Sequence, residues 1–94
     1  MGILKERKLR ALITGAGGFV GGHLCAYLLA HTDWQLTGTV YPRPVEAQPP
    51  EPRLRLQHAD LRDPEGVRTL VGEVRPDYIF HLAAQSFVLT SFAD

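Results

Sequence analysis

The hydrophobic and polar positions in the first half of the chain predict a strand, a helix and a second strand. Leu9–Thr14 has an apolar centre between charged residues and glycines, which is typical of a buried strand. Phe19–Ala30 has apolar residues at helical spacing, and Gln35–Tyr41 is rich in β-branched residues, which favour a strand. The expected buried face of the helix consists of Val20, Leu24, Tyr27 and Leu28.

A proline-rich loop separates the second strand from the next predicted element. Five prolines lie between residues 42 and 52, and they exclude regular structure from the segment that composition makes the least ordered. Arg53–His58 then alternates Arg and Leu, which indicates a strand that is half exposed or near a sheet edge.

A second helix is predicted to begin after Asp63 and to end near Val74. Asp63 is a favourable N-cap, and Pro64 suits the first helical position. Tyr78–Leu82 predicts a fourth, buried strand, and a further helix is expected to begin near Phe87.

Strands separated by helices indicate a three-layer α/β fold with a parallel sheet. The chain has 94 residues, enough for one small domain, which we place at residues 9–94 behind a basic arm at residues 1–8. A solvated terminus is the alternative for that arm. Four strands would leave one sheet edge unpaired, which predicts an association site there.

Composition narrows the classes of partner and compartment. The formal net charge is zero, so nothing attracts the chain as a whole to nucleic acid or to an anionic membrane. No segment approaches the roughly 18 apolar residues of a membrane span. Cys25 is the single cysteine, which excludes an internal disulfide, fits a reducing cytoplasm and favours a buried residue over a nucleophile.

The glycines between the first strand and the first helix have the spacing of a phosphate-binding turn. Gly15, Gly18 and Gly21 follow the pattern G-x-x-G-x-x-G. Gly15 lets the chain turn sharply, Gly18 leaves room for a phosphate at the helix N-terminus, and Gly21 lets the helix approach the strand. The pattern predicts a dinucleotide pyrophosphate as ligand, and the alternative is a purely structural tight turn.

Residues after the second and third strands are candidates for binding the adenosine half of such a ligand. No acidic residue precedes Glu46, whereas Arg43 could pair with a 2′-phosphate, which favours NADP(H) over NAD(H). Asp60 could accept a hydrogen bond from the adenine amino group, and Leu61 could pack beside the ring. The alternatives are a solvated Arg43 and an Asp60 that only begins the turn into the next helix.

Small and polar residues follow the fourth strand. Ala83 and Ala84 permit close approach of a ligand, and Gln85 and Ser86 add polar groups. His81, inside the strand, is interpreted as a packed or hydrogen-bonded residue and not as a general base. The sequence has no zinc-type Cys/His spacing and no G-x-S-x-G elbow, so we predict no metal site and no hydrolase nucleophile.

Together these motifs resemble the extended short-chain dehydrogenase/reductase family of NAD(P)-dependent nucleotide-sugar epimerases and dehydratases. Residues 14–21 match its T-G-x-x-G-F-x-G pattern, Asp60-Leu61 matches its D-[LI] step, and residues 76–84 match its P-D-x-[IV]-[FI]-H-L-A-A pattern. Gln85-Ser86 and the residues around them are most similar to the GDP-mannose 4,6-dehydratases and the related GDP-4-dehydro-6-deoxy-mannose reductases. The dehydratases usually have arginines directly after the second strand, where this sequence has Tyr41 and Pro42 before Arg43.

The resemblance implies a Rossmann-type sheet that binds NADP, or alternatively NAD, as the N-terminal part of a cytoplasmic, homo-oligomeric enzyme. The implied substrate is a nucleotide sugar, with a GDP-sugar favoured. The family's catalytic Tyr-x-x-x-Lys pair is missing, because none of the three tyrosines is followed four residues later by lysine, so we predict no catalytic residue in this chain.

The alternatives to a dehydratase are a reductase or epimerase, a non-catalytic dinucleotide-binding module, and an α/β interaction domain without a ligand. The predicted cofactor-binding residues are Thr14, Gly15, Gly17, Gly18, Phe19, Val20, Gly21, Arg43, Asp60, Leu61, Leu82, Ala83, Ala84, Gln85 and Ser86.

Overall fold

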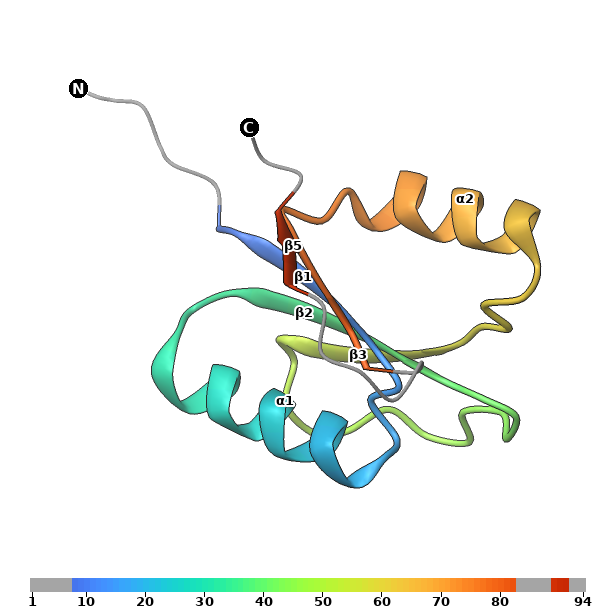
Figure 1. Ribbon diagram of the computed structural model, residues 1–94. Helices are drawn as coiled ribbons and strands as arrows, with labels where there is room; N and C mark the ends of the chain where they lie inside the picture. Colours follow the sequence, from blue (N-terminus) through green and yellow to red (C-terminus); the bar gives the residue numbers. More distant parts are fainter. Residues whose placement is uncertain (1–7, 83–88, 92–94) are drawn as a thin grey trace.

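The structure is a computed structural model that describes residues 8–82 and 89–91 (Figure 1). Strands and helices alternate along these residues as the sequence predicts, as far as the fourth strand. The elements are β1 (Arg10–Thr14), α1 (Phe19–His31), β2 (Gln35–Val40), β3 (Leu54–His58), α2 (Pro64–Val74), β4 (Tyr78–His81) and β5 (Leu89–Ser91).

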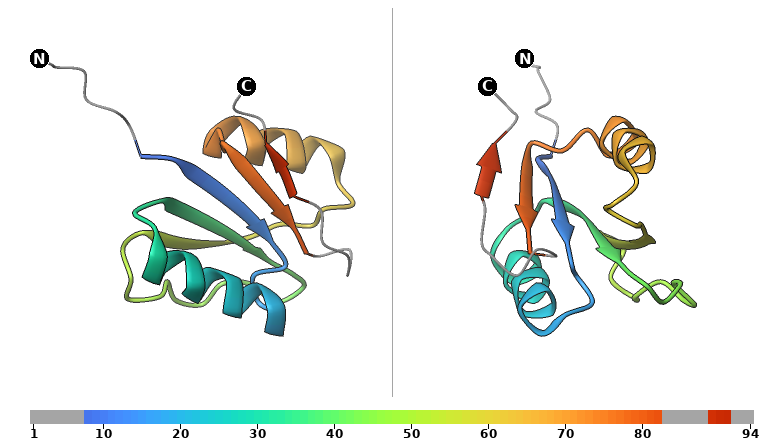
Figure 2. Two further views of the ribbon diagram at one scale, coloured as in Figure 1. Left: turned by 60° about the vertical axis from the view of Figure 1, so that its left-hand side comes forward. Right: turned by 45° about the vertical axis from the view of Figure 1, so that its right-hand side comes forward.

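All five of these strands lie in one sheet with the order β3-β2-β1-β4-β5. β1 pairs in parallel with β2 and β4, and β2 pairs in parallel with β3. Figures 1 and 2 show α1 and α2 on opposite faces of this sheet. The predicted three-layer, Rossmann-type arrangement is therefore confirmed, and it brings the carboxyl ends of the four parallel strands to one edge.

The end of the chain differs from the sequence expectation in two ways. The helix expected to begin near Phe87 is wrong where the structure describes it, because Leu89–Ser91 form a strand; Phe87 itself lies outside the described residues. The free edge expected beside β4 is also wrong, because β5 pairs there antiparallel, with Phe80 opposite Leu89. A strand can satisfy the N–H and C=O groups along the side of β4, which a helix cannot do.

The buried face of α1 is not the face predicted from its apolar spacing. Gly21, Cys25 and Leu28 are buried, whereas Val20 is 45% exposed and Tyr27 is 59% exposed. Small residues at 21 and 25 allow α1 to lie close to β1, and this contact decides the orientation of the helix. Cys25 is buried as predicted, and burial raises the pKa of its thiol, as expected for an unreactive cysteine.

The proline-rich loop has no helix or strand, as predicted, but it is fastened to the edge strand β3. The side-chain amide of Gln48 donates to the carbonyl of Leu56 and accepts from its backbone N–H, both at 2.8 Å. At the other end of β3, Nε2 of His58 lies 3.1 Å from the carbonyl oxygen of Pro42. β3 is an edge strand, as its alternating sequence predicts, and Gln48 occupies part of that edge as a neighbouring strand would.

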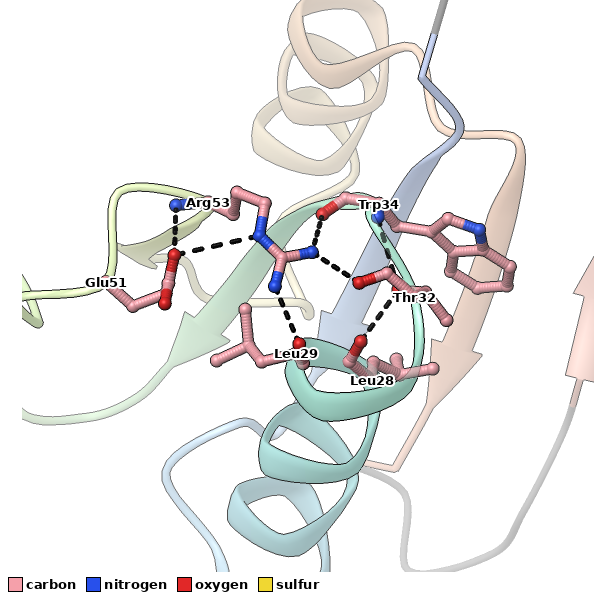
Figure 3. Close-up of polar contacts among 6 residues, drawn as sticks. All are labelled: Leu28, Leu29, Thr32, Trp34, Glu51 and Arg53. Carbon is pink, nitrogen blue, oxygen red and sulfur yellow. Dashed lines mark hydrogen bonds and ion pairs between the residues drawn. The ribbon is translucent and has the colours of Figure 1, made fainter.

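Arg53, just before β3, closes the C-terminal end of α1 (Figure 3). Its Nη1 donates to the carbonyl of Thr32 and its Nη2 to that of Leu29, each at 2.6 Å. Glu51 lies on the other side of the guanidinium, with Oε2 3.7 Å from Nε. A cation at a helix C-terminus stabilises the carbonyls that have no partner within the helix, so Arg53 ties α1 to the edge of the sheet.

The helix α2 follows its sequence prediction closely. Oδ1 of Asp63 accepts a hydrogen bond from the backbone N–H of Glu65 at 3.2 Å, and Pro64 occupies the first turn. Leu70 is the buried residue of this helix, and Val67 and Val71 beside it are half-buried, which is the predicted apolar face. No helix in the described part of the chain has the length and apolar character needed to cross a membrane.

Candidate functional site

The glycine turn between β1 and α1 has the geometry that its sequence predicts. Gly15 has a positive φ of 76°, which side chains other than glycine rarely adopt. The N–H of Gly18 donates to the carbonyl of Gly15 at 3.1 Å and closes the turn. A Cβ on Gly21 would collide with the backbone oxygen of Gly15 and would lie 2.8 Å from Cα of Ala16. Gly15 and Gly21 are therefore required by the protein's own packing.

Two residues of β2 hold this turn in place. The carbonyl of Thr39 accepts from the N–H of Ala16 at 2.8 Å, and its hydroxyl lies 3.3 Å from the N–H of Gly15. A Cβ on Gly38 would lie 2.5 Å from Cβ of Ala16, so only glycine fits beneath the turn. Sequence reasoning missed both residues as part of the site, because their role depends on the pairing of β1 with β2. A glycine inside a predicted strand was the signal that could have found Gly38.

Gly18 and the start of α1 are open where the glycine turn leaves them. Gly18 is exposed, and a Cβ there would meet only the oxygen of Gly15, at an ordinary 3.5 Å. The helix has no side-chain cap at its N-terminus and no acidic residue in its first turn. Its first N–H groups and the positive end of its dipole therefore remain for an external anion, so the turn fits a dinucleotide pyrophosphate.

A cleft of about 1010 Å³ runs from this turn along the proline-rich loop. Gly15, Gly17 and Gly18 line one side of it, and Tyr41 and Arg43 line the other. Arg43 is exposed, and its guanidinium has no hydrogen bond or ion pair with residues 8–82. The structure thus brings Arg43 to the same cleft as the glycines.

A second cleft, of about 360 Å³, lies between the glycine turn and the carboxyl end of β3. Asp60 and Leu61 line it together with Tyr41 and Arg62, and Gly15 forms its inner end. The two predicted adenine contacts, Asp60 and Leu61, are therefore placed side by side within reach of the turn.

Asp60 is engaged by Arg62, a residue that sequence reasoning did not single out. Nε of Arg62 lies 3.0 Å from Oδ1 of Asp60, and Nη2 lies 3.0 Å from Oδ2. Hydrogen bonds from this guanidinium hold the pKa of Asp60 at about 2, well below its ordinary value. Nη2 of Arg62 also donates to the hydroxyl of Tyr41 at 2.7 Å. These three residues form one network at the carboxyl ends of β2 and β3.

Thr14 and His81 join the carboxyl ends of β1 and β4 below the turn. Oγ1 of Thr14 lies 2.8 Å from Nδ1 of His81, and the N–H of Leu82 donates to the carbonyl of Thr14 at 3.2 Å. Thr14 is buried, so its described contacts are with the protein. His81 is a hydrogen-bonded histidine inside the sheet, as predicted.

The remaining predicted cofactor residues fall into two groups. Phe19 and Val20 are 81% and 45% exposed at the start of α1, where their side chains lie outside both clefts. The predicted contacts at Ala83, Ala84, Gln85 and Ser86 lie outside the described residues. Within residues 8–82, no three His, Cys, Asp or Glu side chains gather closely enough to hold a metal ion.

Comparison with known proteins finds relatives among enzymes of nucleotide-sugar metabolism. The chain is 38% identical to the GDP-6-deoxy-D-mannose reductase of Pseudomonas aeruginosa, over 90% of this chain and 23% of that protein. It is 34% identical to the GDP-mannose 4,6-dehydratase of Yersinia enterocolitica, over 88% of this chain and 25% of that protein. The chain thus spans about a quarter of the length of these relatives.

Solved structures of related proteins share the fold. The enzyme WbmH of Bordetella bronchiseptica, solved in complex with NAD+, matches with a TM-score of 0.67 at 25% identity, over 82% of this chain and 26% of that one. The UDP-glucose 4-epimerase of Thermotoga maritima, solved with UDP-glucose, matches with a TM-score of 0.65 at 26% identity, over 83% of this chain and 25% of that one.

The family model described as GDP-mannose 4,6 dehydratase matches residues 12–94, from the end of β1 onward. This match includes the glycine turn, Asp60-Leu61 and the strand that carries His81, which are the motifs that carry the sequence resemblance to extended short-chain dehydrogenases/reductases. That resemblance is confirmed by the model and by the relatives. The chain belongs to the GDP-mannose 4,6-dehydratase family.

Proposed function

We propose that this chain is the cofactor-binding N-terminal portion of an NADP(H)-dependent dehydratase that acts on a GDP-sugar. The observation that carries the proposal is the uncapped start of α1, which opens at Gly18 onto the cleft that Arg43 lines. An uncapped helix N-terminus accepts an anion, and an arginine after the second strand accepts a 2′-phosphate. The names of the relatives support a GDP-sugar as the substrate of the whole protein.

Each half of the cofactor has a proposed place in the chain. The N–H groups at Gly17 and Gly18 bind the pyrophosphate, Asp60 accepts from the adenine amino group, and Leu61 packs beside the ring. When bound, NADP+ supplies the hydride acceptor that oxidation of a sugar C4 hydroxyl requires. Elimination of water across C5–C6 and return of the hydride then complete the dehydration.

Proton transfer at the sugar falls to residues beyond this chain. None of Tyr27, Tyr41 and Tyr78 has a lysine four positions later, so the acid–base pair of the family has no counterpart here. The whole protein is proposed to be a cytoplasmic homo-oligomer. The single, buried Cys25 supports a reducing compartment, because the chain offers no pair of cysteines to oxidise.

A reductase is the second candidate, because the relative from Pseudomonas aeruginosa, at 38% identity, carries that name. A reductase would transfer hydride from NAD(P)H to a 4-keto sugar. Assays of the whole protein separate the two: a dehydratase consumes GDP-mannose with no net oxidation of cofactor, whereas a reductase consumes reduced cofactor only with the 4-keto sugar.

Calorimetric titration of the chain with NADP+ and with NAD+ tests the cofactor proposal. Circular dichroism confirms beforehand that the sample is folded. We expect saturable binding that is tighter for NADP+, and we expect Arg43→Ala to weaken NADP+ more than NAD+. A folded chain without saturable binding of either dinucleotide would contradict the proposal.

A further inference from the structure

Tyr41 stands directly after β2, at the place where a Rossmann-type sheet senses the adenosine ribose. An acidic residue there selects a free 2′-hydroxyl, and an arginine accommodates a 2′-phosphate. Tyr41 is neither acidic nor basic, but its hydroxyl accepts a hydrogen bond from Nη2 of Arg62 at 2.7 Å. A cation from the end of β3 therefore occupies the place that the sequence leaves without a charge at the end of β2.

The guanidinium of Arg62 is fixed on three sides by the protein. Asp60 holds it with two side-chain contacts of 3.0 Å, and its Cζ lies 5.4 Å from the centre of the Tyr41 ring. The side chain is nevertheless 77% exposed, and within residues 8–82 no hydrogen bond is made by its Nη1. A planar cation is thus held in one orientation with a donor edge facing the solvent of the second cleft.

We propose that Arg62 is a specificity-determining residue that binds the 2′-phosphate of NADP(H), with Tyr41 and Asp60 as its positioning residues. This inference rests on the proposed function, because it requires an adenine dinucleotide in the two clefts. Arginine presents paired N–H donors that match phosphate geometry, and hydrogen bonds between charged groups are stronger than neutral ones.

Arg62 contributes more to this contact than Arg43, because Arg62 is already ordered. Arg43 has no partner among the described residues, so binding a phosphate has to immobilise a long, free side chain. Arg62 has lost that freedom in the network with Asp60 and Tyr41, and a preorganised donor binds with a smaller entropic cost.

Asp60 keeps a role toward adenine within the same network. Its Oδ1 accepts from both the backbone N–H and Nε of Arg62, whereas Oδ2 accepts from Nη2 alone. A carboxylate oxygen has two acceptor sites, so Oδ2 can also accept from the adenine amino group. The negative charge of Asp60 restricts the binding of anions to the outward edge of Arg62, which limits the anions that fit.

The test compares two small probes that differ only in the 2′-phosphate, 2′,5′-ADP and 5′-AMP. Each is titrated calorimetrically into the wild-type chain and into Arg62→Gln, Arg43→Gln and Tyr41→Phe. Arg55→Gln is the matched control, because Arg55 is an exposed arginine of β3 outside both clefts and its loss changes the net charge equally.

We expect Arg62→Gln to weaken 2′,5′-ADP about tenfold and 5′-AMP less than about twofold, as for loss of a charge-assisted hydrogen bond. Arg43→Gln and Tyr41→Phe should have smaller effects in the same direction, and Arg55→Gln should have none. Arg62→Lys should recover part of the loss, because lysine retains the charge without the paired donors.

Three results would overturn the inference. Equal weakening of both probes by Arg62→Gln would assign Arg62 to the adenine ring, and a larger effect of Arg43→Gln would assign the phosphate to Arg43. If the folded wild-type chain bound neither probe, the proposed function would fail and the inference with it. Binding of both probes with no effect of Arg62→Gln would remove the inference alone.

Discussion

The two helices of this chain begin in opposite ways, and the difference separates structure from function. α2 begins with Asp63, whose carboxylate accepts a backbone N–H, followed by Pro64 and by Glu65 in the first turn. α1 begins at Gly18 without a side-chain cap and without an acidic residue. The first N–H groups of α2 are satisfied by its own sequence, whereas those of α1 face the large cleft.

This contrast shows which helix end is available to a ligand. A protein that only needed two stable helices could cap both with aspartate, since a cap stabilises a helix by about 1 kcal/mol. At its C-terminus α1 is closed, because Arg53 donates to two of its terminal carbonyls. The glycines at its N-terminus therefore leave open the one end that fits an anion.

The close approach of α1 to β1 depends on Gly21, and Gly21→Ala should have the largest effect. The added Cβ would collide with backbone atoms of Gly15 and Ala16, which cannot move away as a side chain could. We expect a loss of about 3 kcal/mol in the free energy of unfolding, measured by urea denaturation.

Gly22→Ala is the matched control for Gly21→Ala. Gly22 lies next along α1, and a Cβ there would meet nothing within 4 Å. Alanine should stabilise this helix position by about 0.5–1 kcal/mol. Equal destabilisation by the two substitutions would show that helix packing does not explain the glycine at 21.

The closed end of α1 is tested by Arg53→Met. Methionine retains much of the apolar stem but removes the donors to Leu29 and Thr32, so we expect a loss of about 2 kcal/mol in the free energy of unfolding. Arg55→Met removes an exposed arginine from the same strand and should change stability by less than about 0.5 kcal/mol. Similar losses for both variants would contradict the helix-closing role of Arg53.

Converting the start of α1 into a start like that of α2 should remove ligand binding without unfolding the chain. Gly18 has a φ of −82°, which any residue adopts, and a Cβ there makes only an ordinary contact. Gly18→Asp should add a few tenths of a kcal/mol to stability while weakening NADP+ at least about tenfold, because its carboxylate takes the place of the phosphate.

Gly18→Asn separates the charge of that carboxylate from its size. Asparagine has nearly the same shape and also caps helices, but it is neutral. It should weaken NADP+ less than aspartate does in the same calorimetric titration. Unchanged NADP+ affinity in Gly18→Asp would show that the uncapped end of α1 is not the pyrophosphate site.

The sequence predicted the order of elements well, because each depends on local pattern and punctuation. The start of α2 illustrates this, since Asp63 and Pro64 define it from neighbouring residues alone. The buried face of α1 was predicted wrongly, because counting apolar residues gives no weight to Gly21, whose lack of a side chain is what allows the contact. The expected helix near Phe87 failed at Leu89–Ser91, where pairing with β4 outweighs local preference.

The candidate site was predictable only where its parts lie together in the sequence. The glycine turn is a continuous motif and was found whole. Thr39 and Gly38 support that turn from β2, and Arg62 reaches Tyr41 across 21 positions of the chain. Such contacts depend on which strands become neighbours, and periodicity within one segment does not specify that.

The capped start of α2 provides the complementary test to Gly18→Asp. Asp63→Ala should lower the free energy of unfolding by about 1 kcal/mol, because the N–H of Glu65 loses its acceptor. Asp63→Asn should retain most of the stability. Neither should change NADP+ affinity by more than about twofold, and a large change would show that the two helix starts are not independent.

The smallest expected effect concerns Asp60 and pH. Hydrogen bonds from Arg62 lower the pKa of Asp60 to about 2, below the value of about 3.9 for an unfolded chain. A depressed pKa means that the pair stabilises the folded chain above pH 4 or so and loses this contribution as pH falls toward 2. The contribution is small because the pair is exposed to solvent.

NMR titration of the Asp60 carboxyl carbon measures this pKa directly. We expect a midpoint near 2 in the wild-type chain and a return toward about 3.9 in Arg62→Gln, while Arg55→Gln leaves the midpoint unchanged. A wild-type midpoint near 3.9 would show that Arg62 is not held by Asp60 in solution. Arg62 would then be no better ordered than Arg43, and the preference of the site for a 2′-phosphate would have to come from charge alone.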